Sequence, residues 1–235
     1  MDEYGVDRAV LVQPLYPGED NSYVADCARA EPERFAAACV VDPRELGAED
    51  RLEYWARERG CRGLRLRPGV VGEEEIFGSS RTFPLWERVR DLGVVTNLLM
   101  SLSNVPKVAA LAERFPEVDM VIDHMAAPDV TAGVSGSAFQ ALLALAQFPR
   151  VHVKPTGYYY HSRQAYPYED CWDFFRALYD SFGPARLVWG SDFPHVVLKS
   201  GYRRCLLLQE RCYSFLPAAE LKQIMGDNAS RLYWR

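Results

Sequence analysis

The sequence predicts an α/β protein with a TIM-type (β/α)8 barrel fold, of which seven strands are expected in this chain. Short runs rich in Val, Ile and Leu recur, and polar stretches with helical spacing lie between them. Their ends lie 25 to 36 residues apart, close to the roughly 30 residues of one strand–helix unit. Polar residues gather at these ends, as in barrels. The Gly-rich phosphate turn of a doubly wound sheet does not occur.

The elements follow one another in a regular order. Helices are expected between the strands, where apolar residues recur at helical spacing. No linker, repeat or low-complexity tract interrupts the pattern, so residues 1–235 are expected to form a single domain. The predicted strands are 9–13, 36–41, 63–67, 93–99, 118–124, 151–156 and 186–192, and the predicted helices are 52–59, 85–92, 105–115, 138–147 and 168–182.

Composition excludes several classes of partner. The chain has 27 Lys and Arg against 32 Asp and Glu, a net charge of −5, which predicts neither a nucleic-acid surface nor a polybasic membrane patch. No apolar run is long enough for a bilayer span, and the acidic start does not resemble a signal peptide. Six cysteines without a C-x-x-C motif are expected to be reduced thiols. We therefore expect a cytoplasmic protein.

Alternation along two predicted strands places basic side chains inside the barrel. In 63–67 the leucines face the helices, so Arg65 and Arg67 point toward the barrel axis. The same parity in 151–156 points His152 and Lys154 inward. Unpaired charges are costly in an apolar layer. These residues therefore favour an anion-binding or acid–base site, or else they pair with acidic side chains for structural reasons.

Two further strand ends carry candidate catalytic residues. In 118–124 we expect Met120, Ile122 and His124 to align, and His124 would polarise a carbonyl, bind a metal or form a hydrogen bond within a loop. In 186–192, Asp192 lies above the small Gly190, which leaves room for a ligand. Asp192 would serve as a general base, a metal ligand or a helix N-cap.

Five sequence segments together resemble the amidohydrolase-related family of TIM-barrel hydrolases, in its lactonase-like branch, which includes 2-pyrone-4,6-dicarboxylate lactonase. They occur in the order of the family and span nearly the whole chain. The segments are 5–14 (GVDRAVLVQP), 60–66 (GCRGLRL), 121–125 (VIDHM), 187–195 (LVWGSDFPH) and 226–233 (GDNASRLY).

The resemblance implies a role for each matched residue. Asp192 would take a proton from water, His124 would polarise the lactone carbonyl without a metal, and Arg65 would hold a substrate carboxylate. A guanidinium suits a planar carboxylate. We expect a small acidic substrate, with no nucleic-acid or membrane partner. The expected substrate-binding residues are Arg65, Arg67, Lys154, Tyr158 and Gln13.

One family feature is absent from the sequence. The first strand of the family carries an H-x-H pair, and this chain has no H-x-H. Segment 5–14 matches the second strand, so we expect the first strand–helix unit to be missing. A truncated chain, a homo-oligomer that covers the gap, or an imperfect barrel would each explain this. Zinc sites use about three protein ligands. Because only His124 and Asp192 are candidates here, we expect no required cofactor, and one zinc ion if the H-x-H strand is restored.

Three functions therefore remain as hypotheses. The first is a hydrolase that opens a lactone or similar cyclic ester of an acidic small molecule. The second is a metal-dependent hydrolase or decarboxylase of the same superfamily. The third is a catalytically impaired barrel that only binds its ligand.

Overall fold

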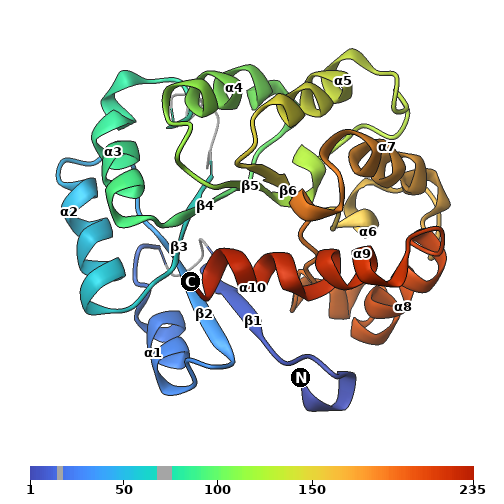
Figure 1. The fold of residues 1–235 in the computed structure, drawn as a ribbon, viewed down its shortest axis with the longest axis horizontal. Coiled ribbons are helices and arrows are strands. Elements are labelled where there is room, and N and C mark those ends of the chain that lie inside the picture. The colour runs from blue at the N-terminus through green and yellow to red at the C-terminus, as the bar shows by residue number, and fades with distance from the viewer. Residues whose placement is uncertain (15–17, 68–75) are drawn as a thin grey trace.

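The computed structural model describes residues 1–14, 18–67 and 76–235, and within them six parallel strands form one sheet. The strands pair in chain order, and the sheet curls into a half-barrel with helices around its outer face (Figure 1). This arrangement confirms the α/β, TIM-type prediction. The strands are β1 Ala9–Val12, β2 Phe35–Val40, β3 Gly63–Leu66, β4 Val95–Leu98, β5 Met120–Ile122 and β6 Val151–Val153.

Helices lie between and after the strands. Within the described residues, no helix is both long and apolar enough to cross a membrane. The predicted helix at 52–59 is the end of α2 and a following stretch of wider turns, Tyr54–Glu58. The helices are α1 Ser22–Ala30, α2 Ala48–Glu53, α3 Phe83–Leu92, α4 Val105–Arg114, α5 Ser137–Ala144, α6 Tyr158–His161, α7 Trp172–Phe182, α8 Tyr202–Cys212, α9 Ala218–Lys222 and α10 Asn228–Tyr233.

The seventh predicted strand, 186–192, does not form a ladder. Leu187 makes a single parallel bridge to Val153 of β6. Beyond it, the N–H of Trp189 donates to the carbonyl oxygen of Ile224 at 2.9 Å instead of to a strand. A neighbouring C-terminal side chain, Asn228, donates to the carbonyl oxygen of Leu187 at 2.8 Å. Residues of the C-terminal helical segment, 223–233, therefore form hydrogen bonds with backbone groups that a seventh strand would use for pairing.

The two faces of the sheet bury different residues. Leu64 and Leu66 of β3 pack in the large core beneath the helices, as alternation predicts. Burying each of these leucine side chains stabilises the folded state by about 1.5–3 kcal/mol. The inner face forms a second, smaller cluster, which Tyr233 of α10 enters from the end of the chain. Its buried members are Ala36, Val95, Val121, Val188, Leu232 and Tyr233.

The chain leaves β5 through a left-handed turn. His124, Met125, Ala126 and Ala127 have φ values of 52°, 57°, 56° and 55°. Such angles are uncommon outside glycine and cluster at functional sites. The predicted alignment of His124 with Met120 and Ile122 is therefore wrong. Those two side chains pack in the core beneath the helices, and the turn redirects His124 because alternation ends with the strand.

Candidate active site

His124 and Asp192 lie together at the carboxyl end of the sheet. His124 follows β5, and Asp192 follows the Leu187 bridge. The imidazole Nε2 of His124 lies 3.7 Å from the carboxylate Oδ1 of Asp192, and their side chains are 16% and 17% exposed. The structure thus brings together the two residues that the sequence proposed as catalytic. Both side chains therefore keep a small surface exposed to solvent.

A buried ionic cluster lies beside this pair. Asp123 is 3% exposed, and its Oδ1 lies 2.8 Å from the ammonium of Lys154. The guanidinium Nη2 of Arg65 lies 3.9 Å from Oδ2 of Asp123. Burial acts to raise the pKa of Asp123, but Lys154, His124 and Arg65 together hold that pKa below its usual value. Two cations therefore share one carboxylate.

His124 is held in place by one neighbour and is kept neutral by burial. Its Nδ1 lies 2.8 Å from Oγ1 of Thr156, which follows β6. Burial lowers the pKa of His124, and the nearby carboxylates of Asp123 and Asp192 oppose this shift only in part. The imidazole is therefore neutral near pH 7.

Asp192 is anchored by a tyrosine. The hydroxyl of Tyr159 donates a hydrogen bond to Oδ2 of Asp192. The backbone of Asp192 has φ 53°, a left-handed conformation that Asp adopts more readily than most residues. Its carbonyl oxygen accepts from the N–H of Val196 at 3.1 Å. The carboxylate accepts no hydrogen bond from the short helical turn that follows, His195–Leu198. Asp192 is therefore not the side-chain N-cap of that turn, which was one of the three roles expected for it.

The remaining predicted site residues lie at different depths. The side chain of Gln13 is buried and donates to the carbonyl oxygen of Asp20 at 2.8 Å, while its backbone carbonyl accepts from Arg65 at 3.4 Å. Arg67 is half-buried just beyond the end of β3. Tyr158 is 5% exposed, and its hydroxyl is 3.0 Å from that of Tyr213.

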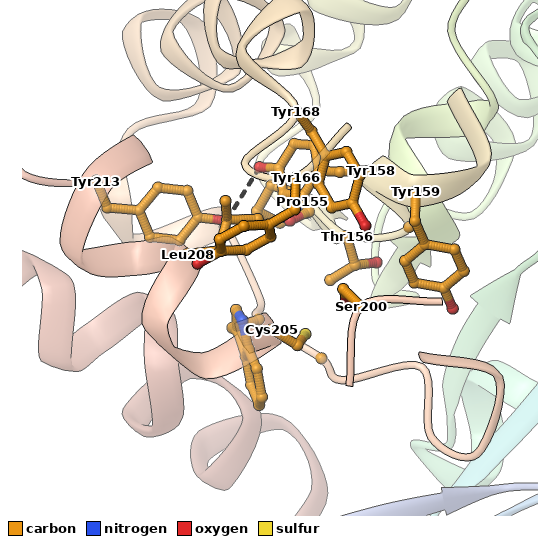
Figure 2. A pocket seen from close by; sticks show the side chains of 13 residues that line it. Pro155, Thr156, Tyr158, Tyr159, Tyr166, Tyr168, Ser200, Cys205, Leu208 and Tyr213 are labelled. Carbon is orange, nitrogen blue, oxygen red and sulfur yellow. Dashed lines mark hydrogen bonds between the residues drawn. The ribbon is translucent and has the colours of Figure 1, made fainter. Parts of the chain in front are cut away.

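An aromatic pocket adjoins the reactive pair, and Figure 2 shows the side chains that line it. Thr156 and Tyr159, which contact His124 and Asp192, stand in its wall. A Cβ added to Gly190 in the same wall would have only Thr156 within 4 Å, at 3.8 Å. The residues lining the pocket are uncharged, and five of them are tyrosines: Tyr158, Tyr159, Tyr166, Tyr168 and Tyr213.

The other inward histidine does not reach this site. His152 lies 3.5 Å from Oδ1 of Asp119, in a cluster that includes Arg150 and Arg235. Asp119 immediately precedes β5, so the cluster belongs to the amino end of the sheet. The inward direction predicted for the His152 side chain is consistent with this contact. The contact lies at the amino end of the sheet, whereas His124 and Asp192 lie at the carboxyl end.

Sequence reasoning assigned no role to four polar residues of the site, although Thr156 is among the polar residues noted at the strand ends. The only sequence feature that pointed to Asp123 is its position directly before His124 in the segment VIDHM. Asn97 accepts from Lys154 at 3.2 Å and from Tyr233 at 2.6 Å, and it sits within an apolar strand. Thr156 and Tyr159 lie in the turn after β6, where alternation no longer assigns direction.

The donor atoms of the site do not fit a zinc ion held by protein ligands alone. Across residues 1–14, 18–67 and 76–235, no three His, Cys, Asp or Glu residues gather closely enough to hold a metal. His124 and Asp192 supply two ligands, and a structural or catalytic zinc needs about three or four. Nδ1 of His124 and Oδ2 of Asp192 already have hydrogen-bond partners.

Comparison with known proteins decides the family. The family model described as amidohydrolase matches residues 1–235. This chain belongs to the amidohydrolase family. The sequence is 31% identical over 238 residues to an L-fucono-1,5-lactonase of Burkholderia ambifaria, covering 97% of this chain and 80% of that one. It is 27% identical over 246 residues to a 2-pyrone-4,6-dicarboxylate hydrolase of Comamonas testosteroni, covering 99% and 78%. The predicted family resemblance is confirmed.

A solved amidohydrolase structure confirms the fold of this family member. The structure, from Burkholderia multivorans, superimposes with a TM-score of 0.88 at 24% identity and covers all of this chain and 85% of the other. That crystal contains bound zinc. The relatives are named hydrolases, so this chain is assigned as an enzyme of the same family.

Proposed function

We propose that this amidohydrolase opens a lactone, or a similar cyclic ester, that carries a carboxylate. The proposal rests on the positions of two cations, Arg65 and Lys154, which both lie near the buried carboxylate of Asp123. His124 and Asp192 lie beside this cluster. The names of the relatives support lactone hydrolysis, since one is a lactonase and another a hydrolase of a pyrone dicarboxylate.

The cluster has an unbalanced positive charge. With both basic side chains protonated and Asp123 ionised, these three groups carry one net positive charge, and their side chains are at most 16% exposed. The other carboxylate of the site, that of Asp192, accepts a hydrogen bond from Tyr159 and lies against His124. A buried surplus charge is costly unless a counter-ion approaches it. A substrate carboxylate would supply that counter-ion, and the planar fork of Arg65 could bind both of its oxygens. Arg67, beyond the end of β3, would assist.

Asp192 and His124 would carry out the chemistry. Asp192 takes a proton from water as the water oxygen attacks the lactone carbonyl carbon. Negative charge develops on the carbonyl oxygen, and the Nε2–H of His124 donates to it. The ring C–O bond then breaks, and the leaving alkoxide receives the proton from Asp192. The product is the open hydroxy acid, and Asp192 is again ionised.

Thr156 supports the required form of His124. If its hydroxyl donates to Nδ1, the single proton of the neutral imidazole resides on Nε2, the nitrogen that faces Asp192. Burial keeps the ring neutral by lowering its pKa. No step of this reaction uses a metal, in keeping with the donor set of the site.

Hydrolysis of a carboxylated δ-lactone, followed with a pH indicator, tests the proposal. We expect turnover by the wild-type chain and a loss of at least about 100-fold in kcat for Asp192→Asn, since general-base catalysis contributes about that much. Asp26→Asn, at an exposed carboxylate on α1, is the control and should keep full activity. Equal rates for Asp192→Asn and wild type would overturn the assignment. Stabilisation by the lactone without turnover would instead indicate a binding protein.

A further inference from the structure

A single turn of the chain contacts both reactive side chains. The segment from Thr156 to the end of α6 follows β6. Thr156 lies against Nδ1 of His124, and three residues later Tyr159 donates to Asp192. Between them, Gly157 approaches His124 so closely that an added Cβ would lie 3.0 Å from Nδ1. The two side chains that face each other across the site are therefore held by one short segment.

Tyr159 holds one particular oxygen of Asp192. Its hydroxyl binds Oδ2, whereas Oδ1 is the oxygen that lies 3.7 Å from His124. Burial and the adjacent Asp192 carboxylate both raise the pKa of Tyr159. The phenol therefore keeps its proton and acts as a donor throughout the pH range in which the protein would work.

The contact is specific to one of three consecutive tyrosines. Tyr158 turns into the pocket wall and meets Tyr213. Tyr160 is 50% exposed. Figure 2 shows Tyr158 and Tyr159 on different sides of the turn, with the ring of Tyr159 directed away from Tyr213. Because consecutive residues of a short helix point in different directions, the turn can present only Tyr159 to Asp192.

We propose that Tyr159 is a positioning residue for Asp192: its hydroxyl occupies Oδ2, so that Oδ1 alone is presented to the attacking water. This inference rests on the proposed function and adds a residue to it. Without the bond, the carboxylate could rotate and present either oxygen to the water.

Tyr159→Phe removes the hydroxyl and keeps the ring. We expect kcat for the carboxylated lactone to fall about 10- to 100-fold, the usual effect of losing one hydrogen bond to a charged group. KM should change less than about twofold, since Tyr159 does not touch the Arg65 and Lys154 cluster in the described structure.

Tyr179→Phe is a matched control. Tyr179 of α7 also donates its hydroxyl to a carboxylate, that of Glu220 in α9, and within the described residues neither forms a hydrogen bond with His124, Asp192 or their partners. Its variant should keep both the kcat and the KM of the wild type. A Tyr159→Phe enzyme with unchanged kcat would overturn the proposal, and so would a loss that Tyr179→Phe reproduces.

A second measurement does not depend on turnover. Urea unfolding of Tyr159→Phe, Asp192→Asn and the double variant forms a double-mutant cycle. Non-additive changes in unfolding free energy would support the contact, and additive changes would overturn it. If the wild-type chain hydrolyses no carboxylated lactone while the cycle shows coupling, the proposed function fails and the Tyr159–Asp192 contact stands. If hydrolysis occurs and the cycle is additive, only the role of Tyr159 fails.

Discussion

The carboxylate of Asp123 lies 2.8 Å from the ammonium of Lys154 in a part of the half-barrel that solvent hardly reaches. The pair joins the end of β5 to the residue after β6, two neighbouring strands. Arg65 of β3, which lies two strands away from β5 in the same sheet, approaches the same carboxylate. Asp123 therefore interacts with both cations of the site. Loss of its carboxylate should destabilise the fold, whereas loss of Arg65 should weaken substrate binding.

Asp123→Asn should strongly destabilise the fold. Removing the carboxylate leaves the partly buried cations Lys154 and Arg65 without the partner that they share, and breaking a buried ion pair in this way costs up to about 3–5 kcal/mol. Urea unfolding at pH 7 measures it. Asp26→Asn breaks exposed pairs with Arg29 and Arg59 and should cost at most about 1 kcal/mol. If Asp123→Asn lowers the unfolding free energy by less than Asp26→Asn does, the Asp123 cluster does not stabilise the protein.

Arg65→Gln should impair binding of the substrate carboxylate. We expect KM for the carboxylated lactone to rise about 10- to 100-fold, as one charge-assisted hydrogen-bonding partner is lost. KM for the methyl ester of the same lactone should hardly change, because the ester carries no charge for Arg65 to bind. Arg29→Gln, at an exposed arginine of α1, serves as the control. Equal effects on acid and ester would place the carboxylate elsewhere.

Gly157→Ala should disturb the position of His124. The glycine has φ +73°, and an added Cβ would lie 3.0 Å from Nδ1 of His124. Gly93→Ala offers a matched comparison, since Gly93 has φ +65° with nothing within 4 Å of the added Cβ. Both variants bear the backbone strain of about 1 kcal/mol, but only Gly157→Ala should lower kcat, by about tenfold or more. Equal activities of the two variants would contradict the importance of this close approach.

Stability should decline as the pH falls from about 6.5 to about 4. Burial, together with the charge of the nearby His124, lowers the pKa of His161 from 6.5 to about 4, although a backbone hydrogen bond to His124 opposes the shift. The unfolded chain then binds a proton at a pH where the folded chain does not, so acid favours unfolding within that window. The shift corresponds to at most about 3 kcal/mol.

Denaturant unfolding at pH 7 and pH 4 tests this dependence. His161→Gln should lose less stability between the two pH values than the wild type does, because it has no imidazole to protonate. His195→Gln changes an exposed histidine and should follow the wild-type dependence. If His161→Gln retains the full wild-type dependence, other groups are responsible for it.

Much of the architecture follows from local patterns in the sequence. The order of strands and helices, the face of β3 that presents Arg65 and the inward direction of Lys154 all follow from periodicity, because a strand exposes alternate residues to opposite faces. The meeting of His124 and Asp192 at one end also follows, since parallel strands end on the same side. These features depend only on the direction and period of the chain.

Packing between distant segments accounts for what the sequence did not specify. Asp123 acquires its role from Lys154 and Arg65, and Tyr159 from Asp192. The strand expected at Leu187 is reduced to one bridge where the C-terminal helical segment binds its backbone. Beyond a strand end no period constrains the backbone, so the direction of each side chain there depends on which neighbours can accept its charge or its hydrogen bond.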